Sequence, residues 1–285
     1  MIESIISGLV SGAGYAILGV CVVTLFRAVG VLNFSQASIG TLGAYTTIVL
    51  ANANVNLLLA VLAGLGVSAL TGLLAGYLMA HWFANATVAV KSAVTIALLI
   101  VLLALGFRLF GNDPRVTPDV VPATSFGVFG VVVTLGTVIA IAVAIAVAVG
   151  VTLVLSRTRT GLRLRAISER PITAELLGIR ANRFSILVWV ATAAFACLAI
   201  LFVAPTLSPT YLTLSFLIVP AMAAGLVGRL QSLPLTIIGG LLIGALQGLG
   251  ARIPFFADYR DVIPLLVIVL ALLWSRRNEV WDVAR

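Results

Sequence analysis

Charge is what this sequence lacks most. Only 9% of its 285 residues are Asp, Glu, Lys or Arg, whereas 62% are hydrophobic. A soluble domain carries roughly 25% charged residues, because water must wet its surface. With a mean hydropathy of +1.23, this chain cannot cover itself with polar groups. A soluble globular domain is therefore excluded, and lipid must be the solvent for most of the chain.

Residues that commonly build reactive sites are also scarce. The two cysteines, Cys21 and Cys197, lie inside apolar runs, and there is one histidine, which argues against a disulfide framework and a metal site. The only lysine, Lys91, is not part of a GxxxxGK[ST] loop that would hold nucleotide phosphates. We therefore expect no catalytic, metal or cofactor site in this chain, and we do not expect an enzyme.

Acidic residues are missing from the apolar runs. All nine lie in predicted loops or at helix ends: Glu3, Asp113, Asp119, Glu169, Glu175, Asp258, Asp261, Glu279 and Asp282. Carriers coupled to protons or sodium usually keep carboxylates inside the bilayer, because an ionisable group there carries the coupling ion. Uphill transport by this chain would need energy from another polypeptide. A passive channel, or a structural membrane subunit without a transport role, stays open as the alternative.

Apolar runs are what the sequence has in abundance. A helix needs about 20 apolar residues to cross a bilayer core, and runs such as 137–155 are apolar on every face, which favours helices over barrel strands. We predict an all-α bundle of eight to ten transmembrane helices and no β-sheet, formed by residues 1–285 as a single domain. The candidate spans are 2–26, 29–51, 57–80, 92–110, 133–155, 184–204, 211–228, 234–251 and 261–275.

Two of these spans carry qualifications. The first, 2–26, lacks the basic start and the small-residue cleavage pattern of a signal peptide, so we read it as a retained span. The second, 29–51, either crosses the bilayer or is broken and re-entrant.

The basic residues indicate orientation. The net charge of +8 does not indicate nucleic-acid binding, because the arginines lie in short loops between apolar runs. Seven of the 17 basic residues lie between Arg157 and Arg183, and Arg276 and Arg277 follow the last span. Since cytoplasmic loops are enriched in Lys and Arg, both regions should be cytoplasmic.

Counting spans backwards from these regions places the N-terminus outside and the C-terminus in the cytoplasm. The loop 111–125 then faces outward, and its three prolines favour an ordered but non-helical lid. Arg252 and Arg260 fall on the outer side, against the bias.

Small residues recur four positions apart, a spacing that lets membrane helices approach closely. The pairs and triplet are Gly8/Gly12, Gly72/Gly76 and Gly240/Gly244/Gly248. They predict tight packing within the subunit; a subunit interface or a translocation surface is the alternative.

The longest polar stretch, 157–183, has an apolar pattern of its own. Leu162 and Ala166 lie one turn apart on one predicted helix, and Pro171 suits the first position of a second short helix. Two short amphipathic helices can bury an apolar face in the groove of a partner. The alternative is a basic loop that lies on anionic lipid headgroups.

Asn33 and Gln36 form a second polar pattern. Asn is a strong N-cap, and a Gln three residues later can reach back to the backbone amide of the cap, as in a capping box. The same geometry also allows a role in a solute pathway. A helix that begins at membrane depth points its positive end toward an anionic group such as a carboxylate. Both interpretations stay open.

The two patterns together resemble a known family. The segment GLRLRAISERPITAELLGI (161–179) looks like the cytoplasmic coupling loop of branched-chain amino acid ABC importer permeases. VLNFSQASIGTLGAY (31–45) resembles the Asn-Phe signature of that family, in the form of the permease that pairs with a longer second permease. LVGRLQSLPLTIIGGLLIGALQGL (226–249) is similar to its Gly-rich penultimate span. The resemblance covers essentially the whole chain. One departure is that Arg170 and Pro171 follow Glu169, where the family often has a second acid.

The resemblance implies a permease subunit of an importer in the bacterial inner membrane. Its expected partners are a second, related permease, two cytoplasmic ATPase subunits that bind ATP, and an extracytoplasmic solute-binding protein. The implied solutes are branched-chain or related amino acids; relatives serve urea, amides and small aromatic acids. The expected pathway residues are Asn33, Phe34, Gln36 and Ser38, and the expected ATPase-coupling residues are Gly161, Arg165, Glu169, Glu175, Leu176 and Gly178.

Overall fold

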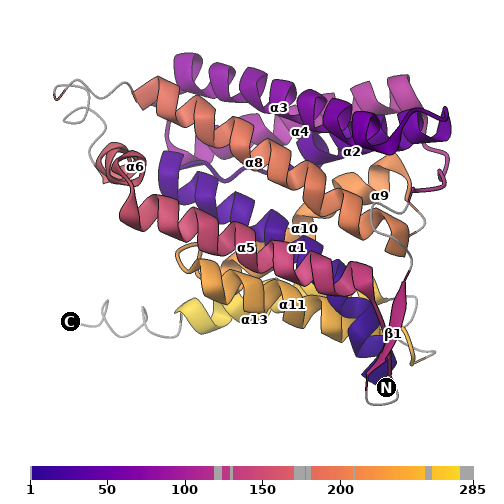
Figure 1. Cartoon of the computed structure of the whole chain (residues 1–285). Helices are drawn as coiled ribbons and strands as arrows, with labels where there is room; N and C mark the ends of the chain where they lie inside the picture. Colours follow the sequence, from indigo (N-terminus) through magenta and orange to yellow (C-terminus); the bar gives the residue numbers. More distant parts are fainter. Residues whose placement is uncertain are drawn as a thin grey trace.

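The structure is a computed structural model, and it describes residues 2–118, 124–128, 131–169, 177, 181–207, 209–253 and 259–276. Within these residues the chain is a helical bundle with one short hairpin (Figure 1). In chain order the elements are α1 (Ile2–Val29), α2 (Gln36–Asn52), α3 (Leu57–Trp82), α4 (Val88–Phe110), β1 (Ser125–Val128), β2 (Val131–Thr134), α5 (Leu135–Arg157), α6 (Arg159–Glu169), α8 (Ala181–Val203), η1 (Ala204–Thr206), α9 (Tyr211–Ser215), α10 (Ile218–Val227), α11 (Leu233–Gly250), η2 (Arg260–Val262) and α13 (Ile263–Arg276).

Every predicted span contains helix, but the helices differ in length. Six helices among the described residues are long and apolar enough to cross a membrane: α1, α3, α4, α5, α8 and α11. The other three predicted spans correspond to shorter helices. The 17-residue α2 replaces the predicted 29–51, a turn between α9 and α10 interrupts 211–228, and the 14-residue α13 replaces 261–275. The prediction of a polytopic helical bundle is confirmed, with fewer full-length crossings than the nine expected.

The prediction of no β-sheet is wrong. β1 and β2 pair antiparallel, with Ser125 opposite Thr134 and Val128 opposite Val131. The second strand is a run of β-branched residues, a type that fits an extended backbone better than a helix. Sequence reasoning had assigned the second half of this run, residues 133 and 134, to the start of the following span.

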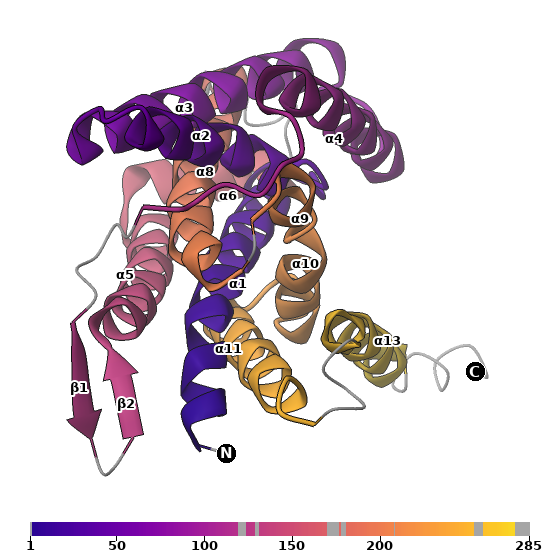
Figure 2. The same ribbon diagram turned by 90° about the vertical axis from the view of Figure 1, so that its right-hand side faces the viewer.

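The α1 helix is the centre of the bundle. In Figure 2, which looks along the bundle, α5, α8, α10 and α11 surround α1, and α2, α3 and α4 form a layer to one side. Its residues between Ala13 and Leu25 are almost all buried, including Ile17 and Leu18 with no exposed surface. On the outer helices the apolar side chains face outward, as on α13, where Leu270 is 65% exposed. This distribution is typical of a protein whose outer surface meets lipid.

Glycines close the main helix seams. α1 packs along α11, and Gly8 and Gly12 meet Gly240, Gly244 and Gly248 backbone to backbone. Gly72 of α3 lies against the Ala193 side chain and the Trp189 backbone of α8, and Gly76 lies against the Trp189 side chain. Both glycine patterns therefore serve packing within the subunit, which was the first interpretation of the sequence.

The two ends of the bundle differ. At one end, hereafter the hairpin end, lie β1, β2 and the start of α1; at the other, hereafter the α6 end, lie α6 and the end of α13 (Figure 1). Residues 111–118 cross the hairpin end as irregular chain, held by bonds such as Asn52 Nδ2 to the Val116 carbonyl oxygen at 3.2 Å (Figure 2). The described part of the predicted lid is thus non-helical and ordered, as expected.

Candidate functional site

The chain breaks between α1 and α2 and re-enters the bundle. Gly30 has φ +67°, a left-handed conformation that glycine adopts without a steric penalty, and α2 begins only at Gln36. Gln36 contacts Thr192, which lies in the middle of α8. The first turn of α2 is therefore level with the centre of a full-length helix. Of the two interpretations of residues 29–51, the structure supports the broken one.

A chain of hydrogen bonds between side chains fixes this break. Asn33 Oδ1 accepts from the Ser35 backbone N–H at 3.0 Å and from Ser35 Oγ at 2.7 Å. Asn33 Nδ2 donates to Gln36 Oε1 at 2.7 Å, and Gln36 Nε2 donates to the Thr192 carbonyl oxygen at 2.9 Å. All three of the residues Asn33, Ser35 and Gln36 are fully buried. The polar groups of the break thus satisfy one another, and the last of them ties α2 to α8.

The predicted capping box is wrong in its details. Ser35, not Asn33, is the residue that precedes the helix, and its side chain makes no capping hydrogen bond. Asn33 instead closes a turn onto a backbone N–H two residues later, a pattern typical of Asn. Gln36 contacts the side chain of Asn33 rather than its backbone amide. The Asn33/Gln36 pattern therefore located the break in the helix correctly, but it did not predict the hydrogen-bond partners of the two side chains.

Thr95 of α4 holds the other side of the break, and sequence reasoning missed it. Its Oγ1 donates to the Leu32 carbonyl oxygen at 2.9 Å and accepts from the Phe34 N–H at 3.1 Å. The side chain is fully buried. The available signal was a lone hydroxyl in the apolar run 93–107.

The four residues proposed for the pathway therefore lie together at the break. Asn33, Gln36 and Ser38 are fully buried and Phe34 is partly buried. Ser38 Oγ is buried without a hydrogen-bond partner. In this conformation their role is to anchor the start of α2, and their place in a solute pathway stays a prediction.

The second candidate site is α6, which lies across the α6 end of the bundle and is seen end-on in Figure 1. The predicted first amphipathic helix of 157–183 is confirmed as Arg159–Glu169. Leu164 is buried and Leu162 is 69% exposed. Because two residues span about 200° of helix rotation, the two leucines lie on opposite sides. One attaches α6 to its own bundle, and the other is presented outward.

Gly161 and Arg165 fasten α6 to the end of α5. Arg165 Nη2 donates to the Leu155 carbonyl oxygen at 2.6 Å, near the C-terminus of α5. A positive charge at this position also interacts favourably with the negative end of the helix dipole. The Gly161 backbone faces the carbonyl groups of Val154 and Leu155 so closely that a side chain has no room. Both residues position α6.

The remaining predicted coupling residues lie largely outside the residues that the structure describes. Glu169 is the last residue of α6, and its side chain lies outside the described residues. Glu175, Leu176 and Gly178 lie outside them entirely, as does the predicted second helix after Pro171. Leu177, which is described, is 75% exposed.

A polar cavity at the hairpin end was not predicted. It has a volume of about 400 Å³, and Gln247, Arg260 and Asp261 are among its lining residues. The signal in the sequence was Arg260, a basic residue on the expected outer side.

The fold and these sites define a multi-pass helical membrane protein with a broken helix in its core and an amphipathic helix across one end. Residues 4–272 match the family described as the permease component of branched-chain amino acid transport systems, and the chain belongs to that family. It is a permease subunit of a transport system, as the sequence motifs indicated.

Individual relatives are more distant. The high-affinity branched-chain amino acid transport system permease protein BraD of Pseudomonas aeruginosa is 25% identical over 301 residues, covering 96% of this chain and 93% of BraD. Among solved structures, PsaBC from Streptococcus pneumoniae in complex with Fab matches with a TM-score of 0.47 and 15% identity, over 96% of this chain and 90% of that one. An inward-facing metal-chelate type ABC transporter matches with a TM-score of 0.48 and 18% identity, over 96% and 84%.

Proposed function

We propose that this chain is a membrane subunit of an ATP-binding-cassette importer that moves branched-chain or related small amino acids across the bacterial inner membrane. Membership of the permease family supports the transport role. The similarity to BraD, a permease protein of a high-affinity branched-chain amino acid transport system, supports the solute class. No carboxylate lies in the interior of a predicted span, since Glu3 and Asp261 lie at span ends, and this favours an energy source outside this chain.

The proposed coupling to ATP hydrolysis rests on one observation: α6 is anchored to the bundle and has an exposed leucine on its outer side. The helix is fixed to α5 through Arg165 and Gly161, so a force applied to it reaches the bundle directly. Leu162 stands on its outer side, 69% exposed. An exposed apolar residue on a short, anchored helix suits insertion into a groove of a partner protein. The proposed partner is a cytoplasmic ATPase, which binds the ATP.

This proposal orients the chain. The α6 end faces the cytoplasm, where Lys and Arg are enriched, and the C-terminus lies on that side. The N-terminus and the hairpin end face outward, toward an extracytoplasmic solute-binding protein. A second, related permease completes the membrane part, and two ATPase subunits bind beneath the pair.

Co-purification followed by uptake tests the proposal. The tagged chain is extracted from its native membrane in mild detergent, and the subunits that accompany it are identified by mass spectrometry. We expect a second permease and an ATPase. The complex is then placed in vesicles with ATP inside and the solute-binding protein outside, and uptake of radiolabelled leucine, isoleucine and valine is measured.

ATP-dependent accumulation of these amino acids supports the proposal. Flux that is independent of ATP would instead identify a passive channel, and competition by urea, amides or small aromatic acids in place of leucine would change the solute class. A chain that purifies alone and moves no solute would be a structural subunit.

A variant of α6 tests the docking surface itself. Leu162→Asp should release the ATPase during purification, because an unpaired charge in an apolar groove costs on the order of several kcal/mol. Leu162→Met is the matched control and should retain it. Normal ATPase retention and uptake by Leu162→Asp would show that this face of α6 is not the docking surface.

A further inference from the structure

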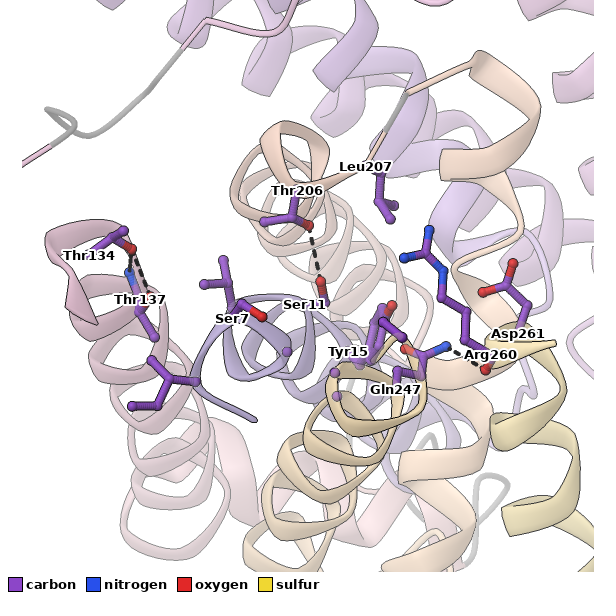
Figure 3. Close-up of a pocket in the computed structure, with 16 residues that line it drawn as sticks. Ser7, Ser11, Tyr15, Thr134, Thr137, Thr206, Leu207, Gln247, Arg260 and Asp261 are labelled. Carbon is purple, nitrogen blue, oxygen red and sulfur yellow. Dashed lines mark hydrogen bonds between the residues drawn. The ribbon is translucent and has the colours of Figure 1, made fainter. Parts of the chain in front are cut away.

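The polar cavity at the hairpin end is formed by residues that are distant in the sequence. The starts of α1 and α5 meet η1, the end of α11 and η2 there (Figure 3). Its volume of about 400 Å³ lies within the range of about 300–1,000 Å³ that is usual for small-molecule sites. Its polar lining residues are Ser7, Ser11, Tyr15, Thr134, Thr137, Thr206, Gln247, Arg260 and Asp261.

One wall of the cavity carries hydroxyl groups. Ser11 Oγ lies 3.0 Å from Thr206 Oγ1, which in turn donates to the Val203 carbonyl oxygen at 2.7 Å. Thr134 and Thr137 form a second hydroxyl pair at 2.8 Å. Hydroxyl groups both donate and accept hydrogen bonds, so this wall accommodates either sign of charge on a ligand.

The opposite wall carries one charge of each sign. Arg260 and Asp261 are neighbours in η2, and Gln247 Nε2 holds their backbone by donating to the Arg260 carbonyl oxygen at 3.3 Å. Neither charged side chain forms an ion pair with another residue in the part of the chain that the structure describes. In the proposed orientation Arg260 lies on the outer side, where basic residues are not needed for topology. Both residues are exposed and line the cavity, where a ligand can reach them.

A second cavity, mostly apolar, adjoins the first. It has a volume of about 390 Å³ and shares Tyr15, Leu207, Gln247, Arg260 and Asp261 with the polar cavity. The rest of its lining comes mainly from apolar residues of α10, of α13 and of the turn before α10: Phe216, Leu217, Val219, Pro220, Pro264 and Leu265. The charged pair thus stands between a hydroxyl-lined space and an apolar one.

We propose that the two cavities form a single entry site for a free amino acid with an aliphatic side chain. This inference rests on the proposed transport of amino acids. A free amino acid carries a carboxylate and an ammonium group on one carbon atom, which matches an arginine and an aspartate that line the same cavity. The Arg260 guanidinium pairs with the carboxylate as a two-pronged donor, and Asp261 accepts from the ammonium group. The aliphatic side chain enters the apolar cavity beside Leu217 and Leu265.

The charge pattern also disfavours other ligands. A phosphate or a simple organic acid would leave Asp261 unpaired beside a like charge, and a plain amine would face Arg260. Within the described residues no group of three or more His, Cys, Asp or Glu side chains is placed to hold a metal ion. A ligand that carries both charges satisfies both side chains at once.

Binding of three matched compounds tests the charged pair. The probes are L-leucine, 3-methylbutylamine, which lacks the carboxylate, and 4-methylpentanoate, which lacks the ammonium group. Their binding to the purified complex, without the solute-binding protein, is measured by saturation-transfer NMR. We expect leucine to bind most tightly. Arg260→Gln should weaken leucine and 4-methylpentanoate roughly tenfold and spare the amine, whereas Asp261→Asn should weaken leucine and spare the acid.

Arg252→Gln is the matched control, because Arg252 is exposed at the same end of the bundle but does not line either cavity. It should bind all three probes like the wild type. Equal affinities for leucine in the wild type, Arg260→Gln and Asp261→Asn would overturn the assignment. So would equal binding of the three probes by the wild type.

A second pair of variants tests the apolar cavity. Leu265→Trp narrows it, whereas Leu266→Trp introduces the same bulk next door, outside the lining. In Leu265→Trp the affinity for leucine should fall severalfold, and the affinity for alanine should not change. Leu266→Trp should bind both amino acids like the wild type. Parallel loss of leucine and alanine in Leu265→Trp would contradict the placement of the side chain.

Uptake separates this inference from the transport proposal. If wild-type complex accumulates leucine with ATP while the Arg260 and Asp261 variants bind and transport normally, the entry site is wrong and the transport role stands. If wild-type complex transports no amino acid, the transport role fails whatever the variants do.

Discussion

The seam between α1 and α11 gives the sharpest test of the fold. Gly240 of α11 is buried against α1, and a methyl group at this position would lie 2.7 Å from Ala16 Cα and 2.9 Å from Ala16 Cβ. Carbon atoms pack at about 3.5–4.0 Å. Gly240→Ala therefore requires the two helices to separate by about 0.8 Å or more. The obstructing atoms belong to the α1 backbone and the short Ala16 side chain, so no rotamer change relieves the contact.

The expected cost is that of an overpacked core, typically about 1–3 kcal/mol. Gly66→Ala is the matched control, since a methyl group there meets nothing within 4 Å. Alanine favours a helix over glycine by about 1 kcal/mol in solution, so this variant should be neutral or slightly more stable. The same substitution thus has opposite effects at two helical glycines.

The assay uses the two buried thiols, Cys21 and Cys197, which have almost no exposed surface. A thiol-reactive fluorescent dye reports their exposure as the purified protein is heated in detergent. A loss of 1–3 kcal/mol corresponds to a melting temperature lowered by roughly 2–12 °C in a chain of this size. Because unfolding of such proteins is often irreversible, the variants are compared at one heating rate. Equal melting of Gly240→Ala and Gly66→Ala would refute the close approach of α1 and α11.

Three further predictions concern the break and the surface helix. Asn33→Ala removes the partner of the Ser35 N–H, the Ser35 hydroxyl and Gln36 Oε1 in a buried site, at about 1–3 kcal/mol for each unsatisfied group. This variant should melt well below Asn33→Ser, whose hydroxyl retains a weaker form of the turn. Thr95→Val removes both hydrogen bonds to the break at nearly constant shape and should lower the melting temperature. Thr71→Val on α3 is the control and should change it little, because the Thr71 hydroxyl bonds only within its own helix. Equal melting temperatures of the two variants would contradict the role of Thr95. Arg165→Met should increase trypsin cleavage at Arg159 and Arg163 by loosening α6, and an unchanged cleavage rate would show that the bond to Leu155 does not hold the helix.

The fold was largely predictable because lipid imposes a simple rule. Each crossing must be a long apolar run, and the described helices begin and end within a few residues of most predicted spans. The exceptions arise where the backbone leaves the helix inside the bundle. Gly30 permits a left-handed turn, and buried side chains of Asn33 and Thr95 then bond to the Leu32 carbonyl and to the N–H groups of Phe34 and Ser35. Hydropathy registers only apolarity and therefore cannot place such a break.

The candidate sites were predictable only where neighbours in the sequence form them. Asn33 and Gln36 are three residues apart, so their pattern was visible, but their contacts with Thr95 and Thr192 join helices that are distant in the chain. The amphipathic pattern of α6 identified the helix and left open which leucine faces outward. The polar cavity draws on six elements, α1, β2, α5, η1, α11 and η2, and no local spacing brings Ser11 and Arg260 together.

A single rigid element connects the two ends at which this chain is proposed to act. α1 has 28 residues, so it is about 42 Å long. Ser11 and Tyr15, in its first half, line the proposed entry site, and the helix also contacts α6. Its glycine seam with α11 permits little bending, because backbone meets backbone along much of its first half. A displacement of α6 by a bound ATPase would therefore reach the entry cavity as a movement of α1 and α11 together. Loosening that seam with Gly240→Ala should weaken the dependence of leucine uptake on ATP more than it weakens leucine binding. Equal effects on the two would argue that α1 does not carry the coupling.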